Sequence, residues 1–167
     1  MFGQLLCACP IEFSSTNPVG SRLQTFRLGD YHKRRWDDKS LAVAWRDMLE
    51  TYDVVVTWNG RRFDMPFLDG RLKEYGLRPV NLARHEDLMF TARHHMRCMG
   101  LKNSKLDTVA KKLRLPVQKT PMVARQWIRA IGGHEPSYRS IIHHCQHDVK
   151  VLAGVWWKLK HLVREIR

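Results

Sequence analysis

The sequence has no long apolar run and is short of acidic residues. No apolar stretch approaches the roughly 18 residues that a membrane-spanning helix needs. Residues 1–9 are too short for a signal peptide and lack its basic start, so we expect a cytoplasmic protein with no membrane contact. Only 16 Asp and Glu stand against 29 Lys and Arg, which gives a formal net charge of +13.

Cysteine is also rare. The four cysteines are Cys7, Cys9, Cys98 and Cys145, and no two have the Cys-x-x-Cys spacing of zinc sites and redox motifs. We therefore interpret them as reduced, mostly buried thiols. A zinc site built from the histidines and cysteines of residues 94–98 and 143–147 is a minor alternative, because no pair has the spacing of a zinc finger.

The excess of positive charge is spread along the whole chain. With a pI near 10.1, it favours a polyanionic partner, most simply nucleic acid. A generally basic surface without such a partner is the alternative. The chain has 167 residues, 44% of them hydrophobic, which is enough for a sizeable core in one domain over residues 1–167.

Strands and helices are both expected. Residues 3–9 and 22–28 have the pattern of a hairpin around a polar loop at residues 14–21. The β-branched run at residues 54–56 predicts a buried central strand. Helices are expected over residues 39–50, 62–75, 87–97, 104–113, 123–131 and 136–163. This order predicts a mixed α/β layer fold.

Polar residues at the predicted helix starts are candidate caps. Asp37 or Asp38 is expected to cap the first helix, and Ser104 a later one. Asp87 stands at the start of another helix, where capping is the expected role and metal binding the weaker alternative. Asp107 is expected to cap or to pair locally.

The most informative stretch follows the central strand. The apolar run ends at Asn59-Gly60, which is a turn signal, and Asp64 stands where the periodicity becomes helical. Open α/β sheets place their chemistry just past the end of a central strand. Asp64 is therefore the first candidate functional residue, with a helix cap as the alternative.

Two motifs carry a resemblance to a known family. Residues 59–68, Asn-Gly-x-x-Phe-Asp-x-Pro-Phe-Leu, resemble the second motif of the DEDD superfamily of 3′–5′ exonucleases. Residues 143–152, His-His-Cys-Gln-His-Asp-Val-x-Val-Leu, resemble the third motif, in which a His or Tyr precedes an Asp by a short helical spacing. Residues 105–113 resemble the helix between these motifs, and the likeness runs from about residue 3 to the end. It implies an α/β, ribonuclease H-like mixed sheet flanked by helices.

The resemblance also implies a reaction. These enzymes hydrolyse phosphodiester bonds at DNA or RNA ends with two divalent ions, Mg²⁺ or Mn²⁺. Asp64 and Asp148 would be metal ligands, and a His would position or deprotonate the attacking water. His144 precedes Asp148 by four residues and so shares its helix face, which favours it over His143. Single-stranded ends are the expected substrate.

Residues near the motifs are candidates for substrate contacts. Basic side chains would contact phosphates, and aromatic side chains would stack on a terminal base. A surface or core-packing role is the alternative for each. The main candidates are Asn59, Arg61, Arg62, Phe63 and Lys105, and weaker ones are Trp58, Lys102 and Lys119.

The family's first motif, an Asp-x-Glu on the opening strand, has no clear counterpart. Pro10-Ile11-Glu12 keeps the Glu but has Pro at the Asp position, and Pro is a poor residue for a central strand. In the better alignment residues 3–9 are the second strand, so the first strand is missing or degenerate and would lie before Met1.

This gap leaves three hypotheses open. The first is a 3′–5′ exonuclease, active or impaired, in which another carboxylate, Glu12 first, replaces the missing motif. The second is a catalytically inactive module that binds nucleic acid. The third, less favoured, is a structure-specific endonuclease of the same fold.

Overall fold

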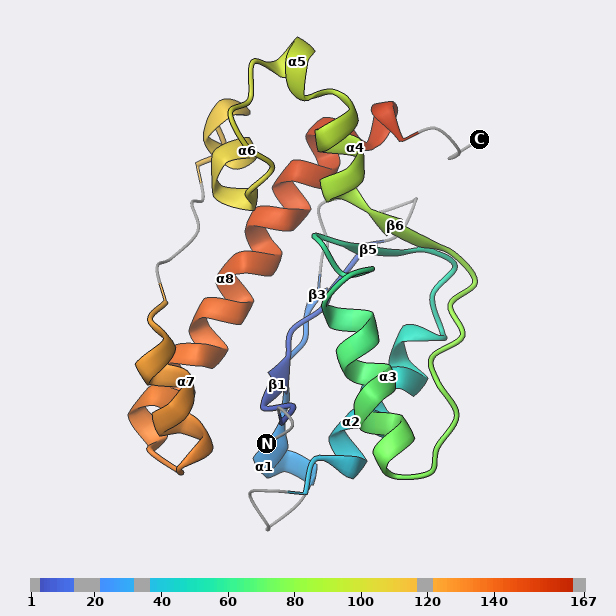
Figure 1. Cartoon of the computed structure of the whole chain (residues 1–167), viewed down its shortest axis with the longest axis vertical. Coiled ribbons are helices and arrows are strands. Elements are labelled where there is room, and N and C mark those ends of the chain that lie inside the picture. Colours follow the sequence, from blue (N-terminus) through green and yellow to red (C-terminus); the bar gives the residue numbers. More distant parts are fainter. Residues whose placement is uncertain (1–3, 14–21, 32–36, 117–121, 164–167) are drawn as a thin grey trace.

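The computed structural model describes a layer of short strands between helices. The described residues are 4–13, 22–31, 37–116 and 122–163. The longest helix, α8 (Glu135–Leu159), runs along one side of the strands, and α2 (Lys39–Leu49) and α3 (Asp64–Glu74) lie on the other (Figure 1). This mixed α/β arrangement agrees with the predicted layer fold.

The N-terminal strands form one antiparallel hairpin. β1 (Cys7–Ala8) pairs with β4 (Phe26–Arg27), and β2 (Ile11–Glu12) pairs with β3 (Arg22–Leu23) in the same register. Pro10 separates β1 from β2 because it has no N–H to donate to the ladder. Its carbonyl still accepts a hydrogen bond from the Gln24 amide at 3.0 Å. The predicted polar loop at residues 14–21 lies outside the described residues.

A second pair of strands is parallel. β5 (Val55–Thr57) is the predicted central strand, and it lies beside β6 (His85–Asp87), which was not predicted. We expected one mixed sheet, but the described strands form three two-stranded sheets. In particular, no described strand joins the hairpin to the β5–β6 pair by backbone hydrogen bonds.

Most predicted helices are present, and several have shifted ends. The residues expected at 87–97 divide into α4 (Leu88–His94) and α5 (Met96–Met99). The predicted strand at 22–28 ends early, because Leu28 begins the short helix α1 (Leu28–Tyr31). The other elements are α6 (Leu106–Lys112), α7 (Ala124–Ile131) and the 3₁₀ helix η1 (Lys160–Leu162).

The predicted caps have different outcomes. Asp38 stands at the N-cap of α2 and makes no cap hydrogen bond there, but Asp37 Oδ1 accepts one from the Lys39 amide at 3.1 Å, so the prediction of Asp37 or Asp38 is confirmed for Asp37. Lys105 rather than Ser104 takes the N-cap position of α6, and Asn103 Oδ1 accepts a hydrogen bond from the Lys105 amide at 3.0 Å. The predicted cap by Asp87 is confirmed, since its carboxylate accepts a hydrogen bond from the Met89 amide at 3.2 Å.

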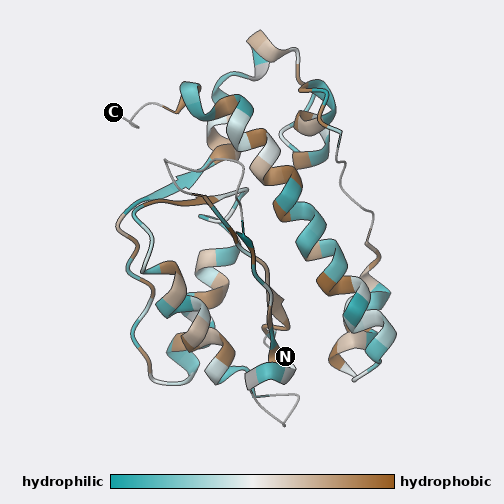
Figure 2. Ribbon diagram, turned by 180° about the vertical axis from the view of Figure 1, so that it is seen from behind, coloured by the Kyte–Doolittle hydropathy of each residue, from teal (hydrophilic) through white to brown (hydrophobic). Residues whose placement is uncertain are grey.

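Three apolar clusters hold these layers together. The first joins the C-terminal half of α8 to α4 and α6, the second joins its N-terminal half to α7 and the start of the hairpin, and the third joins α2, α3 and β5. Hydrophobic and hydrophilic residues alternate along α8 (Figure 2), so its apolar stripe faces these clusters. In the described part of the chain, no helix combines the length and the apolar character that crossing a membrane requires.

Asp38 is fully buried and connects three segments. Its Oδ1 accepts hydrogen bonds from Arg71 Nη2 at 2.6 Å and the Tyr75 hydroxyl at 2.7 Å, and its Oδ2 accepts one from the Leu5 amide at 2.6 Å. Burial alone would raise the pKa of Asp38, but the hydrogen bonds from Arg71, Tyr75 and Leu5 outweigh it and lower that pKa. A charged Asp38 thus fixes the start of the chain and of α2 against α3.

We expect Asp38→Asn to lower the free energy of unfolding by about 3 kcal/mol, because Arg71 would lose its ion pair with the buried carboxylate and keep only the one with the exposed Glu74. The folded-state pKa of Asp38 lies below its unfolded value of about 4, so this contribution is complete above that pH and is lost as the pH falls through the folded pKa. Urea denaturation of both proteins, at neutral pH and below about pH 3, measures the difference.

Asp47→Asn is the matched control. Asp47 is exposed and pairs with its neighbour Arg46, so we expect a change within about 1 kcal/mol. Equal losses of unfolding free energy in the two variants would contradict this role of Asp38. So would a difference between wild type and Asp38→Asn that is as large in acid as at neutral pH.

Candidate nuclease site

The turn after β5 is held by one buried carboxylate. Asp87 is 4% exposed, and its Oδ1 accepts a hydrogen bond from the Asn59 amide at 2.7 Å, while its Oδ2 accepts one from the Arg61 amide at 3.1 Å. Asn59 has a φ of 65°, a left-handed conformation that Asn tolerates better than most residues. The backbone therefore explains why Asn59 stands here, and a substrate contact by its side chain stays a prediction.

Gly60 is required by a close approach. A Cβ at this position would lie 2.4 Å from Thr57 Oγ1 and 2.6 Å from Thr57 Cβ. The Thr57 hydroxyl is itself held, 2.8 Å from Nε2 of His85 on β6. The Asn59 carbonyl accepts hydrogen bonds from the amides of Arg62 and Phe63, which completes the turn.

Asp64 follows this turn, at the start of α3. Phe63 takes the N-cap position, so Asp64 lies in the first helical turn instead of capping the helix. The residue is exposed, but protein atoms surround much of its carboxyl group. This desolvation raises the pKa of Asp64; its own amide opposes the rise, and the electrostatic effects of Cys145 and Asp87 add to it.

His144 and Asp148 share one face of α8. His144 Nε2 lies 3.5 Å from Asp148 Oδ2, and the two side chains are 12% and 26% exposed. The predicted proximity of these two residues is confirmed, as expected for positions one helical turn apart. His143 points elsewhere: it is exposed, and its ring stacks on that of His147 with centroids 6.3 Å apart.

Basic and aromatic side chains are exposed beside the turn. Phe63 is 66% exposed, and the Arg62 guanidinium lies 5.4 Å from the centroid of the Phe90 ring. The Arg61 guanidinium donates a hydrogen bond to the His85 carbonyl, and Arg61 and Phe90 line an open cavity of about 380 Å³. Cations and exposed rings together are the pattern of surfaces that contact phosphates and unstacked bases.

The remaining candidates are lysines at or near α6 and Trp58, which directly precedes the turn. Lys105 is exposed at the start of α6, as is Lys102 in the segment before it, and Lys119 is outside the described residues. Trp58 is half-buried and packs against the cluster between α4, α6 and α8, which agrees with a core role. Asp107 pairs locally, its Oδ2 lying 2.7 Å from Lys111 Nζ.

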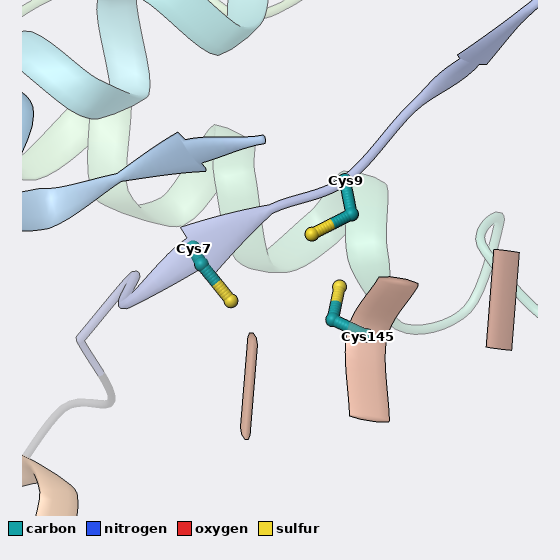
Figure 3. Close-up of side chains that lie close together, drawn as sticks. All are labelled: Cys7, Cys9 and Cys145. Atoms are coloured by element: carbon teal, nitrogen blue, oxygen red, sulfur yellow. The ribbon is translucent and has the colours of Figure 1, made fainter. Parts of the chain in front are cut away.

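Sequence reasoning missed a cluster of three cysteines. Cys7 and Cys9 of the hairpin and Cys145 of α8 have their sulfur atoms within 4.8 Å of one another and directed toward one another (Figure 3). Cys145 follows Cys9 by 136 positions, so no local pattern announces the cluster. The only local signal was the alternate spacing of Cys7 and Cys9, which places both on one face of a strand.

The pKa values of the three thiols are shifted in different directions. Hydrogen bonds from Cys145 and Cys7 lower the pKa of Cys9 to about 4. For Cys145, a hydrogen bond with Cys7 is outweighed by one with Cys9 and by burial, which raises its pKa to about 12. Hydrogen bonds to Cys145 and Cys9, together with burial, raise the pKa of Cys7 well above its usual range. The titration of each thiol in the cluster therefore depends on the other two.

A family model described as RNase H superfamily (RNase_H_2) matches residues 21–159, which is most of the chain. The chain belongs to the RNase H superfamily. No curated protein matches it. The superfamily associates this domain with nuclease-type activity on nucleic acids, which agrees with the basic composition.

Nucleases of the RNase H superfamily generally use divalent metals, and hard cations such as Mg²⁺ need several oxygen ligands. Among the described residues, the three cysteines lie close enough together to share a metal ion. No group of three Asp or Glu side chains does so in the same residues. Glu12, the expected substitute, already accepts hydrogen bonds from Tyr52 and Gln24. Asp64 and Asp148 alone therefore do not fit a complete two-metal site. The zinc group proposed around residues 94–98 and 143–147 is likewise not formed by the described residues.

We expect Gly60→Ala to lower the free energy of unfolding by about 1–3 kcal/mol, because the new Cβ would collide with Thr57. Gly70 is the matched control: it lies inside α3 and has open space around its missing Cβ. Gly70→Ala is expected to raise stability by up to about 1 kcal/mol. Urea denaturation compares the three proteins, and a Gly60→Ala variant as stable as the wild type would contradict this account of the turn.

Proposed function

We propose that this RNase H superfamily domain is a metal-dependent 3′–5′ exonuclease that hydrolyses phosphodiester bonds at the ends of DNA or RNA. The observation that carries the proposal is the placement of Asp64. Asp64 follows the central strand, and the electrostatic influence of Cys145 on its carboxyl group supports a position facing the part of α8 that holds His144 and Asp148. This supports a site in which the two resembling motifs, more than 70 residues apart in the sequence, lie close together.

Each site residue has a role in this proposal. Asp64 and Asp148 would hold the proposed Mg²⁺ or Mn²⁺, although two carboxylates alone do not complete a two-metal site. His144 takes the proton of the attacking water, and the Asp148 carboxylate, 3.5 Å from its Nε2, orients the imidazole. His143 is the second choice, because it is exposed and directed off this face.

The substrate surface lies next to Asp64. Arg61 and Arg62 come directly before it in the turn and would contact phosphate oxygens. Phe63 is 66% exposed and would stack on the terminal base. Lys105, at the exposed start of α6, is a more distant phosphate contact in this proposal. A single strand suits such a surface because its bases are free to stack.

A catalytically inactive nucleic-acid-binding module is the second candidate. It is favoured by one observation, the absence of a third acidic ligand among the described residues. The same basic and aromatic surface would serve it without change. The two functions therefore differ in turnover and not in binding.

Degradation of a 5′-labelled single strand in the presence of Mn²⁺ tests the exonuclease. We expect a ladder of shortened products from the wild type, reduced at least about 100-fold in Asp64→Asn and Asp148→Asn because each removes a charged metal ligand. Asp53→Asn is the control, since Asp53 is exposed and lies before the strand. A circular strand should stay intact, and its cleavage would indicate an endonuclease instead.

Absence of a ladder from a folded wild type that still binds the strand would refute the exonuclease and leave the binding module.

Binding is expected to depend steeply on salt. Arg61→Ala and Arg62→Ala should each weaken binding to single strands of any sequence and reduce the slope of log affinity against log salt by about 1. Lys73→Ala is the control, because Lys73 is exposed at the far end of α3. Fluorescence anisotropy between about 50 and 200 mM salt measures these slopes. Equal slopes in all four proteins would exclude the turn as the phosphate-binding surface.

A further inference from the structure

The cysteine cluster has the geometry of a thiolate metal site. In a tetrahedral zinc site the Zn–S bonds are about 2.3 Å, which sets the S–S separations near 3.8 Å. The sulfur atoms of Cys7, Cys9 and Cys145 already lie within 4.8 Å of one another. Each would move by about 1 Å or less to reach a common ion, and the side chains already converge on one point (Figure 3).

The backbone on both sides of the cluster is fixed. The Tyr138 hydroxyl on α8 donates a hydrogen bond to the Leu6 carbonyl at 2.9 Å and accepts one from the Leu28 amide at 3.0 Å. At the residue after Cys145, Gln146 Nε2 donates to Thr25 Oγ1 at 2.7 Å. The hairpin and α8 are thus joined directly beside the three sulfurs, and their separation does not depend on a bound ion.

The donor chemistry selects the ion. Thiolates are soft ligands that favour zinc and copper(I) over magnesium, which prefers oxygen. Within the described ranges, no fourth Cys, His, Asp or Glu side chain belongs to the group. Three sulfurs from the protein leave one position of a tetrahedral ion to water or to an external ligand.

We propose that Cys7, Cys9 and Cys145 bind one thiophilic cation, with Zn²⁺ as the ion, and that this ion clamps the hairpin to α8. The site is separate from the pair Asp64 and Asp148 in its donors and in its metal. It does not depend on the proposed exonuclease activity. Because Cys145 adjoins His144, loading the site would hold the His144 segment of α8 against the strands.

The reduced protein is titrated with Cd²⁺, which reports bound thiolates by charge-transfer absorption in the ultraviolet. We expect saturation at one ion per chain and displacement of Cd²⁺ by an excess of Zn²⁺ but not of Mg²⁺. Cys145→Ser and Cys7→Ser should lose at least about tenfold in affinity through loss of one ligand. Cys98→Ser is the matched control, because Cys98 is exposed and outside the cluster.

Alkylation of the wild type tests the site without any substitution. With Zn²⁺ present, peptide mass mapping should show Cys7 and Cys145 modified at least about tenfold more slowly, and Cys98 at an unchanged rate. The melting temperature should rise with Zn²⁺ in the wild type and in Cys98→Ser. Alkylation of Cys7 and Cys145 at the same rate with and without Zn²⁺, or Cd²⁺ absorption equal in the wild type and Cys145→Ser, would overturn the proposal.

Discussion

The candidate site depends on the hydrogen bonds that the Asp87 carboxylate accepts. It accepts hydrogen bonds from the amides of Asn59, Arg61 and Met89, so it joins the end of β5 to the start of α4. Buried amides without partners would be costly, and no other acidic side chain is described at this turn. This turn sets where α3 begins, and it therefore also sets the direction of the Asp64 carboxyl group. Asp87, for which metal binding was the weaker alternative, thus accepts hydrogen bonds from backbone amides and fixes the turn.

Local sequence patterns predicted the helices and contacts that depend on residues close together in the sequence. The helices α2, α3 and α8 follow from apolar periodicity, and the pairing of His144 with Asp148 follows from their spacing of four. β6 has the sequence His-Glu-Asp and no apolar alternation, so only its pairing with a strand 30 residues earlier makes it a strand. Asp37 or Asp38 was expected to cap α2, and Asp37 accepts the hydrogen bond from the Lys39 amide, because a half-buried Arg71 from another helix binds the Asp38 side chain.

The site was predictable to a similar extent. Asp64 stood out because a lone carboxylate follows an apolar strand, and its role as a metal ligand stays a prediction. The cysteine cluster was not predictable, because it forms between segments that only the fold brings together. Glu12, the predicted substitute for the first motif, is held by Tyr52, whose pKa rises to about 12 through burial and this hydrogen bond.

The Tyr138 hydroxyl has a consequence for the order in which the chain assembles during synthesis. It bonds to Leu28 and Leu6, which precede it by 110 and 132 residues, and Gln146 reaches Thr25 across 121. The hairpin is made first but receives its covering helix only when α8 has left the ribosome. Contacts of such long sequence separation form slowly. Until then only α2 can cover the hairpin, and the apolar surface that α8 buries stays exposed, which favours aggregation of the nascent chain.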